Sequence, residues 1–222
     1  MPNWVTNKVQ AAEHVIRAML NAEGNVDFNT MAPFPGPNDD WDGIYGDAET
    51  AAEVVCQTPL NSHPLIAILE VGNRERIDIK KMSDESFRQF VGMLENYRAC
   101  GYLHSMEFAR AVWGTKWNAC RPKAEPENGR CEFETAWSCP TGVFEKLSER
   151  FPNEPITVTF ADEDIGSNCG TLILKAGRTA EEYIAPRWDS MLDDDKDKWR
   201  AFAYEVTGRQ PEPEDEQPPA KG

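Results

Sequence analysis

The sequence predicts a protein of the α+β class, with a ferredoxin-like core in which helices cover one face of an antiparallel sheet. Two patterns lead to this prediction. Segments with apolar residues at every second position, typical of strands, alternate with segments whose apolar residues recur every three or four positions, typical of amphipathic helices. When residues 38–112 are set aside as a helical insertion, the order is β-α-β-β-β-α-β-β, close to that of a ferredoxin-like sandwich.

The first elements precede the insertion. Residues 4–11 alternate in polarity and predict a strand. Residues 12–22 predict a helix, and Gly24 just beyond them is a suitable stop. The apolar stripe of this helix is Val15, Ile16, Met19 and Leu20. Residues 26–31 are expected to be extended, and the prolines that follow break regular structure.

The insertion is predicted to be mostly helical. Residues 49–56 and 102–112 predict short helices, and a longer one lies between them. Ser83 is suited to cap this longer helix, and Gly101 is suited to end it. Its expected inward face consists of Phe87, Phe90, Val91, Leu94 and Tyr97.

After the insertion the apolar period changes to two. Residues 113–119 and 131–137 predict the two strands of a hairpin. Residues 141–151 predict a helix with one apolar side. Two further strands are expected at residues 156–160 and 170–175, the second as an addition at an edge of the sheet.

The C-terminal part is predicted as an extension of the core. Residues 178–208 predict an appended helical segment. Its apolar stripe is Trp199, Phe202, Ala203 and Val206. Residues 209–222 are rich in proline and acidic residues, so a disordered tail is expected there. One domain with an insertion is therefore expected over residues 1–208.

Composition limits the classes of partner. The formal net charge is −15, which disfavours duplex DNA as a ligand and suits either docking on a basic surface or solubility alone. No apolar run approaches the roughly 20 residues of a membrane helix, and the first residues lack the pattern of a signal peptide. A soluble cytoplasmic protein is expected, with its six cysteines reduced.

Three stretches of the sequence resemble one known family. They are residues 1–7 (MPNWVTN), residues 113–119 (WGTKWNA) and residues 133–140 (FETAWSCP). Over residues 1–31 and 112–176 the chain resembles the YubB-type ferredoxin-like family of phages, prophages and conjugative plasmids. The resemblance implies a ferredoxin-like fold and a mobile-element origin. It carries over no catalytic residue, because that family has no established activity.

The predicted hairpin carries a concentration of aromatic residues. Trp113, Trp117 and Trp137 fall at alternate positions, beside Lys116 and Asn118. Single-stranded nucleic acids bind such faces by stacking bases on aromatic rings while cations hold the backbone. Alternatively, large aromatics at period two pack into the core against the helices. We favour the core interpretation and keep the binding face as a candidate site.

Acidic clusters form the other candidate site. They comprise Asp39, Asp40 and Asp42, residues 162–164 and residues 193–197. Such carboxylates can hold Mg²⁺ or Ca²⁺, or imitate the phosphates of DNA, but a solvated surface is the simpler interpretation. Cys-x-x-Cys, Gly-x-Ser-x-Gly and P-loop strings are absent from the sequence, so no catalytic residue, metal ligand or cofactor is predicted.

These observations leave three functional hypotheses. The leading one is a non-enzymatic accessory protein of a phage or plasmid, which binds and modulates a host or defence protein through its acidic surface. The first alternative is a single-stranded nucleic-acid binding module that uses the aromatic hairpin. The second alternative is a metal-dependent hydrolase that uses an acidic cluster. The identity of the partner and the oligomeric state are left open.

Overall fold

A computed structural model describes residues 2–211 of the chain, so the predicted tail lies almost wholly outside the described residues. The chain divides into two compact units. The first is formed by Met1–Met31 together with Trp117–Gly222, and the second by Ala32–Lys116. The second unit contains the segment for which a helical insertion is predicted.

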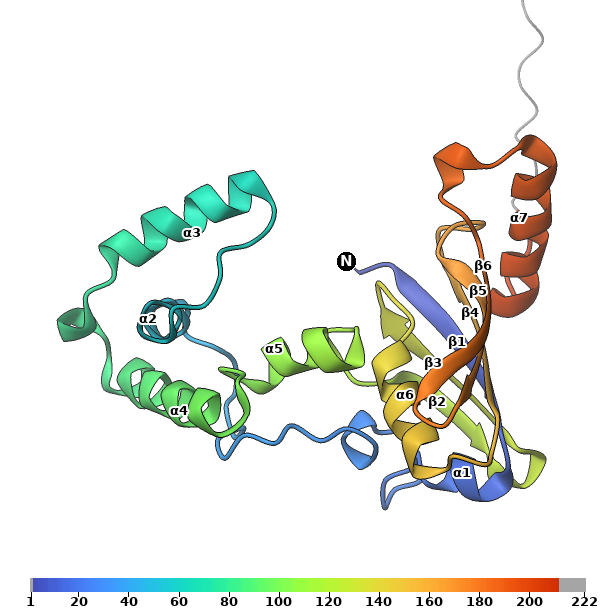
Figure 1. Ribbon diagram of the computed structural model, residues 1–222, viewed down its shortest axis with the longest axis horizontal. Helices are drawn as coiled ribbons and strands as arrows, with labels where there is room; N and C mark the ends of the chain where they lie inside the picture. The colour runs from blue at the N-terminus through green and yellow to red at the C-terminus, as the bar shows by residue number, and fades with distance from the viewer. Residues whose placement is uncertain (1, 212–222) are drawn as a thin grey trace, which may run out of the picture. The chain divides into compact units, whose positions relative to one another are not determined.

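The first unit is built on a six-stranded antiparallel sheet in the order β2-β3-β1-β4-β5-β6 (Figure 1). Its strands are β1 (Trp4–Gln10), β2 (Cys120–Glu125), β3 (Arg130–Ala136), β4 (Ile156–Asp162), β5 (Cys169–Lys175) and β6 (Arg178–Ile184). Its helices are α1 (Glu13–Arg17), α6 (Thr141–Arg150) and α7 (Asp193–Thr207). The order β1-α1-β2-β3-α6-β4 is ferredoxin-like. The predicted α+β class and antiparallel sheet are therefore confirmed.

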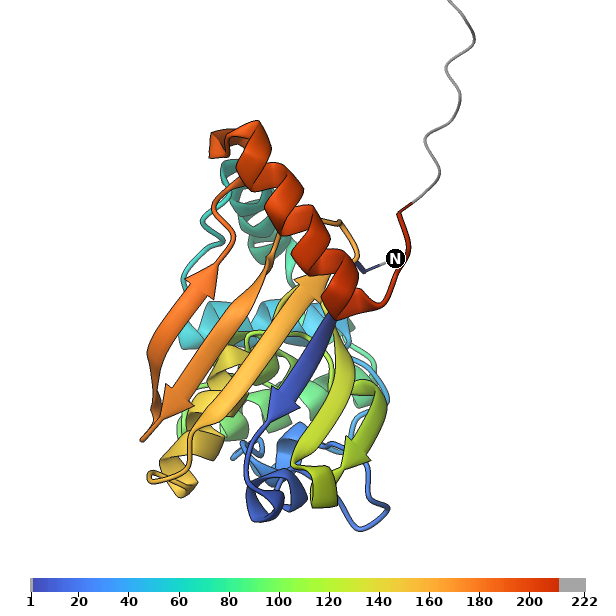
Figure 2. The same ribbon diagram turned by 90° about the vertical axis from the view of Figure 1, so that its right-hand side faces the viewer.

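The sheet separates two apolar layers. Helices α1 and α6 lie on one face, where Phe133 of β3 packs 6.2 Å from Phe144 of α6, measured between ring centroids. Helix α7 crosses part of the opposite face and packs Trp199 and Ala203 against Ala161 (Figure 2). Side chains alternate between the faces of a strand, so β4 supplies both layers. The C-terminal extension thus covers the sheet face that the ferredoxin-like helices leave open.

Some predicted elements of the first unit differ from those observed. The predicted helical segment 178–208 is wrong in its first part, because β6 is a strand paired with β5 along the sheet edge. Its side chains are mostly exposed, so backbone pairing and not an apolar pattern defines it. Helix α1 ends at Arg17, short of the predicted residue 22. Residues 26–31, predicted to be extended, contain the 3-10 turn Phe28–Thr30.

The predicted strand at residues 113–119 is also wrong. A π-helical turn covers Ala109–Trp113 and ends at Gly114, whose φ of +79° belongs to the left-handed region that glycine tolerates. The pairing of β2 with β3 begins only at Cys120. The two strands of the hairpin are therefore β2 and β3, and the tryptophans before β2 lie outside the sheet ladder.

The second unit is helical over its described residues. Its helices are α2 (Gly46–Cys56), α3 (Pro64–Arg76), α4 (Asp84–Cys100) and α5 (Ser105–Phe108). Small residues of α2 pack against Phe90 and Met93 of α4 to form its core. The sequence analysis did not predict α3, which begins with Pro64 at its first position, where the missing N–H costs nothing.

In the longest helix of the second unit, α4, the buried face differs from the predicted one because it includes polar residues. Ser83 caps α4 by accepting a hydrogen bond from the Ser86 N–H at 3.1 Å, and Gly101 ends it, as predicted. Phe87 and Val91, however, are exposed. The buried face instead includes Asn96, whose amide group has backbone partners. Across residues 2–211 no helix is long and apolar enough to cross a membrane.

Candidate functional site at one end of the sheet

Several strand ends meet at one end of the sheet in the first unit. Because neighbouring strands are antiparallel, the start of β1 lies beside the ends of β3 and β4. Trp4 pairs with Ala136, and Val5 pairs with Asp162. The residues that follow β3 and β4 and those that precede β1 and β2 are therefore gathered here, although they are far apart in sequence.

Three tryptophans form a cluster at this end. The ring centroids of Trp4 and Trp117 lie 6.2 Å apart, and those of Trp117 and Trp137 lie 5.3 Å apart. Trp117 is 38% exposed and Trp137 is 47% exposed. The guanidinium of Arg121 stacks 5.1 Å from the centroid of Trp4. We call Trp4, Trp117 and Trp137 the tryptophan face.

The backbone around the tryptophan face is strained. Trp137 has a φ of 65° and Arg121 a φ of 49°, in the left-handed region that costs residues with a side chain about 1–2 kcal/mol. Hydrogen bonds hold the first of these conformations: the Trp137 N–H donates to the Asn3 carbonyl at 2.8 Å, and the side chain of Asn168 donates to the Trp137 carbonyl at 3.0 Å. Such strain persists where the surroundings fix it, and it is frequent at binding sites.

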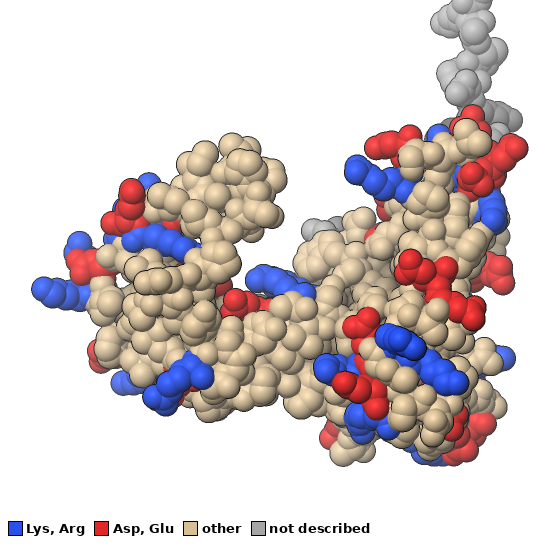
Figure 3. All heavy atoms as spheres, viewed as in Figure 1, with Lys and Arg blue, Asp and Glu red and all other residues tan. Residues whose placement is uncertain are grey.

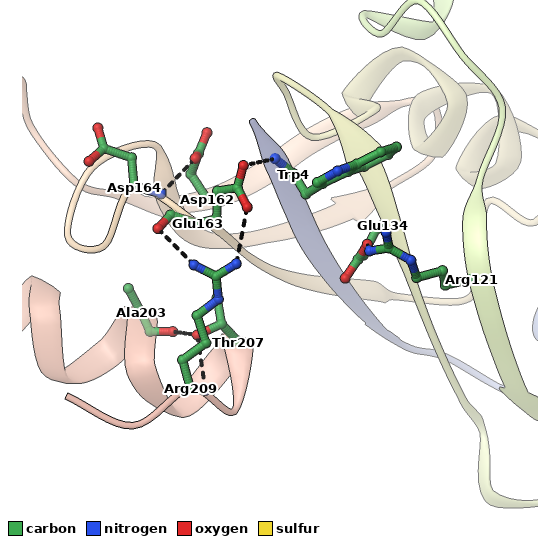
Figure 4. Close-up of polar contacts among 9 residues, drawn as sticks. All are labelled: Trp4, Arg121, Glu134, Asp162, Glu163, Asp164, Ala203, Thr207 and Arg209. Carbon is green, nitrogen blue, oxygen red and sulfur yellow. Dashed lines mark hydrogen bonds and ion pairs between the residues drawn. The ribbon is translucent and has the colours of Figure 1, made fainter. Parts of the chain in front are cut away.

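Carboxylates surround the start of β1 (Figure 4). Glu163 accepts a hydrogen bond from the Trp4 N–H at 3.1 Å and forms an ion pair with Arg209 at 3.0 Å. Arg121 pairs with Glu134. Among the charged residues drawn in Figure 4, both guanidinium groups have a carboxylate partner, and the carboxylates outnumber them. Carboxylates therefore lie beside the Trp4 end of the tryptophan face.

Asp162 is the buried member of this acidic group. Its carboxylate accepts hydrogen bonds from the Asp164 N–H and from the Asn168 side chain, both at 2.8 Å. It is 4% exposed and shapes the turn that follows β4. The run at residues 162–164 is thus partly a structural turn, the role in which aspartate commonly bonds nearby backbone N–H groups.

The same sheet face that carries Trp4 also carries a groove. Its volume is about 630 Å³, and it runs over β1, β2, β3 and β4 beside the end of α7. Its charged lining is balanced between Lys8, Lys123, Arg130, Glu125, Glu132 and Glu205. Two of these groups pair with each other, Lys123 with Glu132 at 3.9 Å. The groove offers polar contacts of both signs but no nucleophile with a base beside it.

The structure places the predicted residues of the aromatic hairpin in different environments. Trp117 and Trp137 belong to the tryptophan face. Trp113 belongs to the second unit, where it is buried and its indole N–H donates to the Ala32 carbonyl at 2.8 Å. Asn118 fixes a turn, because its side-chain oxygen accepts from the Phe28 N–H at 2.9 Å. Lys116 is half-buried at the end of the second unit.

Trp4 and Arg121 were not predicted as site residues. The alternation of β1 contained a signal for Trp4, since it placed Trp4 on the face opposite to Val5. No pattern in the sequence indicated that Trp4 would meet a residue more than a hundred positions away. No sequence pattern indicated Arg121 as a site residue, because its position depends on the irregular pairing between Cys120 and Lys123.

The acidic cluster of the second unit is a surface loop. Asp39, Asp40 and Asp42 are exposed before α2. Within residues 2–211, no three or more His, Cys, Asp or Glu side chains are grouped so that they could hold a metal ion. The run at residues 193–197 begins α7, where acidic side chains interact favourably with the helix dipole.

The thiols near the tryptophan face are poor nucleophiles. Burial raises the pKa of Cys139 to about 12. Burial and, secondarily, the Asp162 carboxylate raise the pKa of Cys169 to about 11. Since the thiolate is the nucleophilic form, a thiol of pKa 12 is about one part in 10,000 reactive at pH 8. The site therefore contains no cysteine primed for covalent catalysis.

This thiol chemistry gives a direct prediction. In the native protein at pH 8, Cys131, Cys139 and Cys169 should react with iodoacetamide at least about tenfold more slowly than Cys100, because they are buried and their pKa values are raised. Peptide mass spectrometry after timed alkylation measures the rates, and urea-unfolded protein is the control in which all sites react. Rapid native alkylation of Cys139 would show that the turn after β3 opens readily.

Comparisons with known proteins address the fold. Residues 112–202 match a family model described as the ferredoxin-like domain in Api92-like protein. The crystal structure of protein api92 from Yersinia pseudotuberculosis covers 84% of this chain and 99% of its own, with 10% identity and a TM-score of 0.37, which is too low to carry an argument. No curated protein matches the chain. Residues 112–202 are thus similar to the ferredoxin-like domain of Api92-like proteins, within a chain of the α+β class.

Proposed function

We propose that this chain is a non-catalytic accessory protein that binds a host or defence protein through the tryptophan face. One observation carries the proposal: Trp117 and Trp137 lie 5.3 Å apart and remain substantially exposed, and Trp137 is held in a strained backbone conformation. Tryptophan is enriched among the residues that dominate protein interfaces. A rigid ring pair loses little conformational freedom on binding.

The chemistry of the site favours a basic segment of the partner. Lysine and arginine side chains bind over indole rings, and nearby carboxylates add to the attraction. The net charge of −15 steers a basic partner towards the chain before contact. This refines the hypothesis of an acidic binding surface by giving it an aromatic centre. The attraction of a basic partner then rests mainly on the net charge of the chain, because Glu134 and Glu163 are each paired with an arginine.

The proposed setting is a phage or plasmid acting in the host cytoplasm. Support comes from the resemblance of residues 1–7, 113–119 and 133–140 to the YubB-type family. This support is associational, since origin and fold do not determine function. The binding proposal itself rests on the tryptophan face and is independent of that origin.

Single-stranded nucleic acid is the second candidate ligand, because exposed indole rings also stack on bases. The charges argue against it. Arg121 and Arg209 are each paired with a carboxylate, so they offer phosphates little unneutralised charge. A protein ligand therefore agrees better with the site.

The proposal is tested with the tagged chain in host lysate, with and without nuclease, followed by mass spectrometry. The double variant W117A/W137A should reduce capture of a stoichiometric protein partner at least about tenfold, because two ring contacts are lost. The matched control is Y45A, since Tyr45 is 48% exposed in the second unit, against 47% for Trp137. Y45A should leave capture unchanged.

A defined ligand separates the two candidates. Intrinsic fluorescence is titrated with a lysine- and arginine-rich peptide and with an oligothymidylate, at 50 and 300 mM salt. The peptide should bind more tightly and lose affinity at the higher salt. Tighter binding of the oligonucleotide, abolished by W117A/W137A, would transfer the function to nucleic acid. Partner capture that is indifferent to W117A/W137A would exclude the tryptophan face.

A further inference from the structure

Helix α3 of the second unit carries an exposed aliphatic face. Leu65, Ile68 and Leu69 are 68%, 67% and 67% exposed, and Ile66 is 44% exposed. Within Pro64–Arg76 no residue is buried. Figure 3 shows the first turns of α3 as a surface free of Lys, Arg, Asp and Glu atoms. We call Leu65, Ile66, Ile68 and Leu69 the aliphatic face of α3.

The orientation of α3 is inverted relative to an ordinary surface helix, which turns its apolar stripe towards the core. Its polar side faces α2: Glu70, Asn73 and Arg76 line a hollow of about 600 Å³ with residues of α2. Arg74 forms an ion pair with Glu53 at 3.3 Å and donates to the Thr58 carbonyl at 2.9 Å. Polar bonds therefore attach α3 to its unit and leave the aliphatic face in water.

We expect such an exposed aliphatic face to be covered by a binding partner. The four side chains leave on the order of 400 Å² of aliphatic surface, a size at which exposed patches mark interaction sites. A helix of 13 residues is also marginal in water without packing. We propose that a second copy of this chain covers the aliphatic face, with two α3 helices paired antiparallel about a two-fold axis.

The distribution of charge along α3 favours this self-pairing. All of its charged residues lie in its second half: Glu70, Arg74, Glu75 and Arg76. In an antiparallel pair the charged half of each helix lies beside the uncharged first half of the other, so like charges stay apart. A parallel pair would place each arginine beside its own copy. Antiparallel pairing also aligns the two helix dipoles favourably.

The seam has the spacing of a helix pair. Leu65, Ile68, Leu69 and Gly72 occupy positions i, i+3, i+4 and i+7 on one side of α3. In the antiparallel arrangement Leu65 of one copy lies opposite Gly72 of the other, whose surface is partly covered by its own Arg76 side chain. The same patch meets itself across the axis, as a two-fold interface requires.

The surface area predicts a weak dimer. Two aliphatic faces with their flanks would bury about 1,000 Å² in total, at the lower limit for specific interfaces, where association is weak and transient. We therefore expect a dissociation constant in the micromolar range. A membrane is the less suitable occupant, because a chain of net charge −15 is repelled by anionic lipid. A second copy of the chain is available wherever the chain is made, and its concentration is that of the chain itself.

Sedimentation equilibrium of the full chain tests the proposal between about 1 and 200 μM, the range around a micromolar constant. The apparent mass should rise with concentration from 25.0 kDa towards twice that value. Raising salt from 50 to 500 mM should strengthen the dimer, because salt screens the repulsion between two acidic chains. Partner binding at the tryptophan face has the opposite expected salt dependence, so the two proposals fail separately.

The variant I68E/L69E should weaken dimerisation at least about tenfold, by placing four carboxylates at the seam. The control is L192E, since Leu192 is 75% exposed and belongs to the first unit. Both variants should keep the circular dichroism of the native chain, because the replaced side chains are exposed. Dimerisation of I68E/L69E within twofold of the native chain would overturn the proposal. A chain that stays monomeric at 200 μM and 500 mM salt would also overturn the proposal, even if that monomer bound neutral lipid vesicles through the aliphatic face.

Discussion

Replacing Phe133 by alanine is expected to lower the free energy of unfolding by about 3–5 kcal/mol, the usual cost of emptying a buried phenylalanine site. Phe133, in the middle of β3, is 0% exposed. Its ring lies 5.6 Å from Phe28 and 6.2 Å from Phe144, in an edge-to-face and a tilted arrangement. The variant therefore removes contacts to the segment after α1 and to α6 at once.

Urea unfolding followed by circular dichroism measures this loss for the first unit. F87A is the matched control, since Phe87 is 45% exposed on α4 and should cost about 1 kcal/mol or less. F133L should fall between the two, because leucine fills part of the cavity. Equal losses for F133A and F87A would mean that the aromatic layer between β3 and α6 does not stabilise the sheet.

Replacing Asn96 by alanine is expected to cost about 2–4 kcal/mol, because it leaves buried backbone groups without partners. Asn96 is 0% exposed in α4. Its amide nitrogen donates to the carbonyls of Asn38 at 2.8 Å and Leu103 at 3.0 Å, and its oxygen accepts from the Asn38 N–H at 2.9 Å. One side chain thus joins the start of the second unit to the loop after α4.

The matched control is N38A. The Asn38 side chain donates an exposed bond to Glu95 at 3.0 Å and longer bonds to the Gly92 carbonyl at 3.3 Å and to the Asn96 side-chain oxygen at 3.5 Å. The two shorter bonds between the Asn38 backbone and Asn96 survive the change. It should therefore cost about 1 kcal/mol or less. Hydrogen exchange across residues 84–103 and urea unfolding measure both variants. If N38A were as damaging as N96A, the side chain of Asn96 would not be the source of the stability.

The sequence predicted elements well where apolar periodicity and burial coincide. Strands β1, β3 and β4 and helix α6 each carry an apolar side that faces the core, so pattern and structure agree. Strand β6 is defined by backbone pairing at an edge, and backbone hydrogen bonds leave no signature in side-chain polarity. For this reason the sequence predicts β6 only as part of a helical segment.

Helix α3 shows the opposite failure. Its apolar residues are present in sequence, but they face water, and its inner side is polar. In α4, the polar Gln89 and Asn96 are buried with partners, which turns the buried face away from Phe87. A count of apolar spacing alone cannot detect buried polar residues or an apolar face that stays exposed.

Two of the three residues of the tryptophan face were predictable. Trp117 and Trp137 stood out as aromatic residues on either side of a hairpin. Their partner Trp4 joins them through the pairing of β1 with β3, two strands that are far apart in sequence. The acidic neighbours arise in the same way, because the Glu163 side chain meets the start of β1 only in the folded sheet.

At Trp137 the left-handed backbone conformation favours glycine, whereas the tryptophan face needs an indole ring. Its φ of 65° is one that glycine adopts without cost and a bulky side chain does not. Exchange for glycine would relax the backbone and at the same time remove a ring from the tryptophan face. Folding stability and the proposed recognition thus favour different residues at this position. Screens that optimise heat resistance alone would tend to remove the indole on which the proposed partner binding depends.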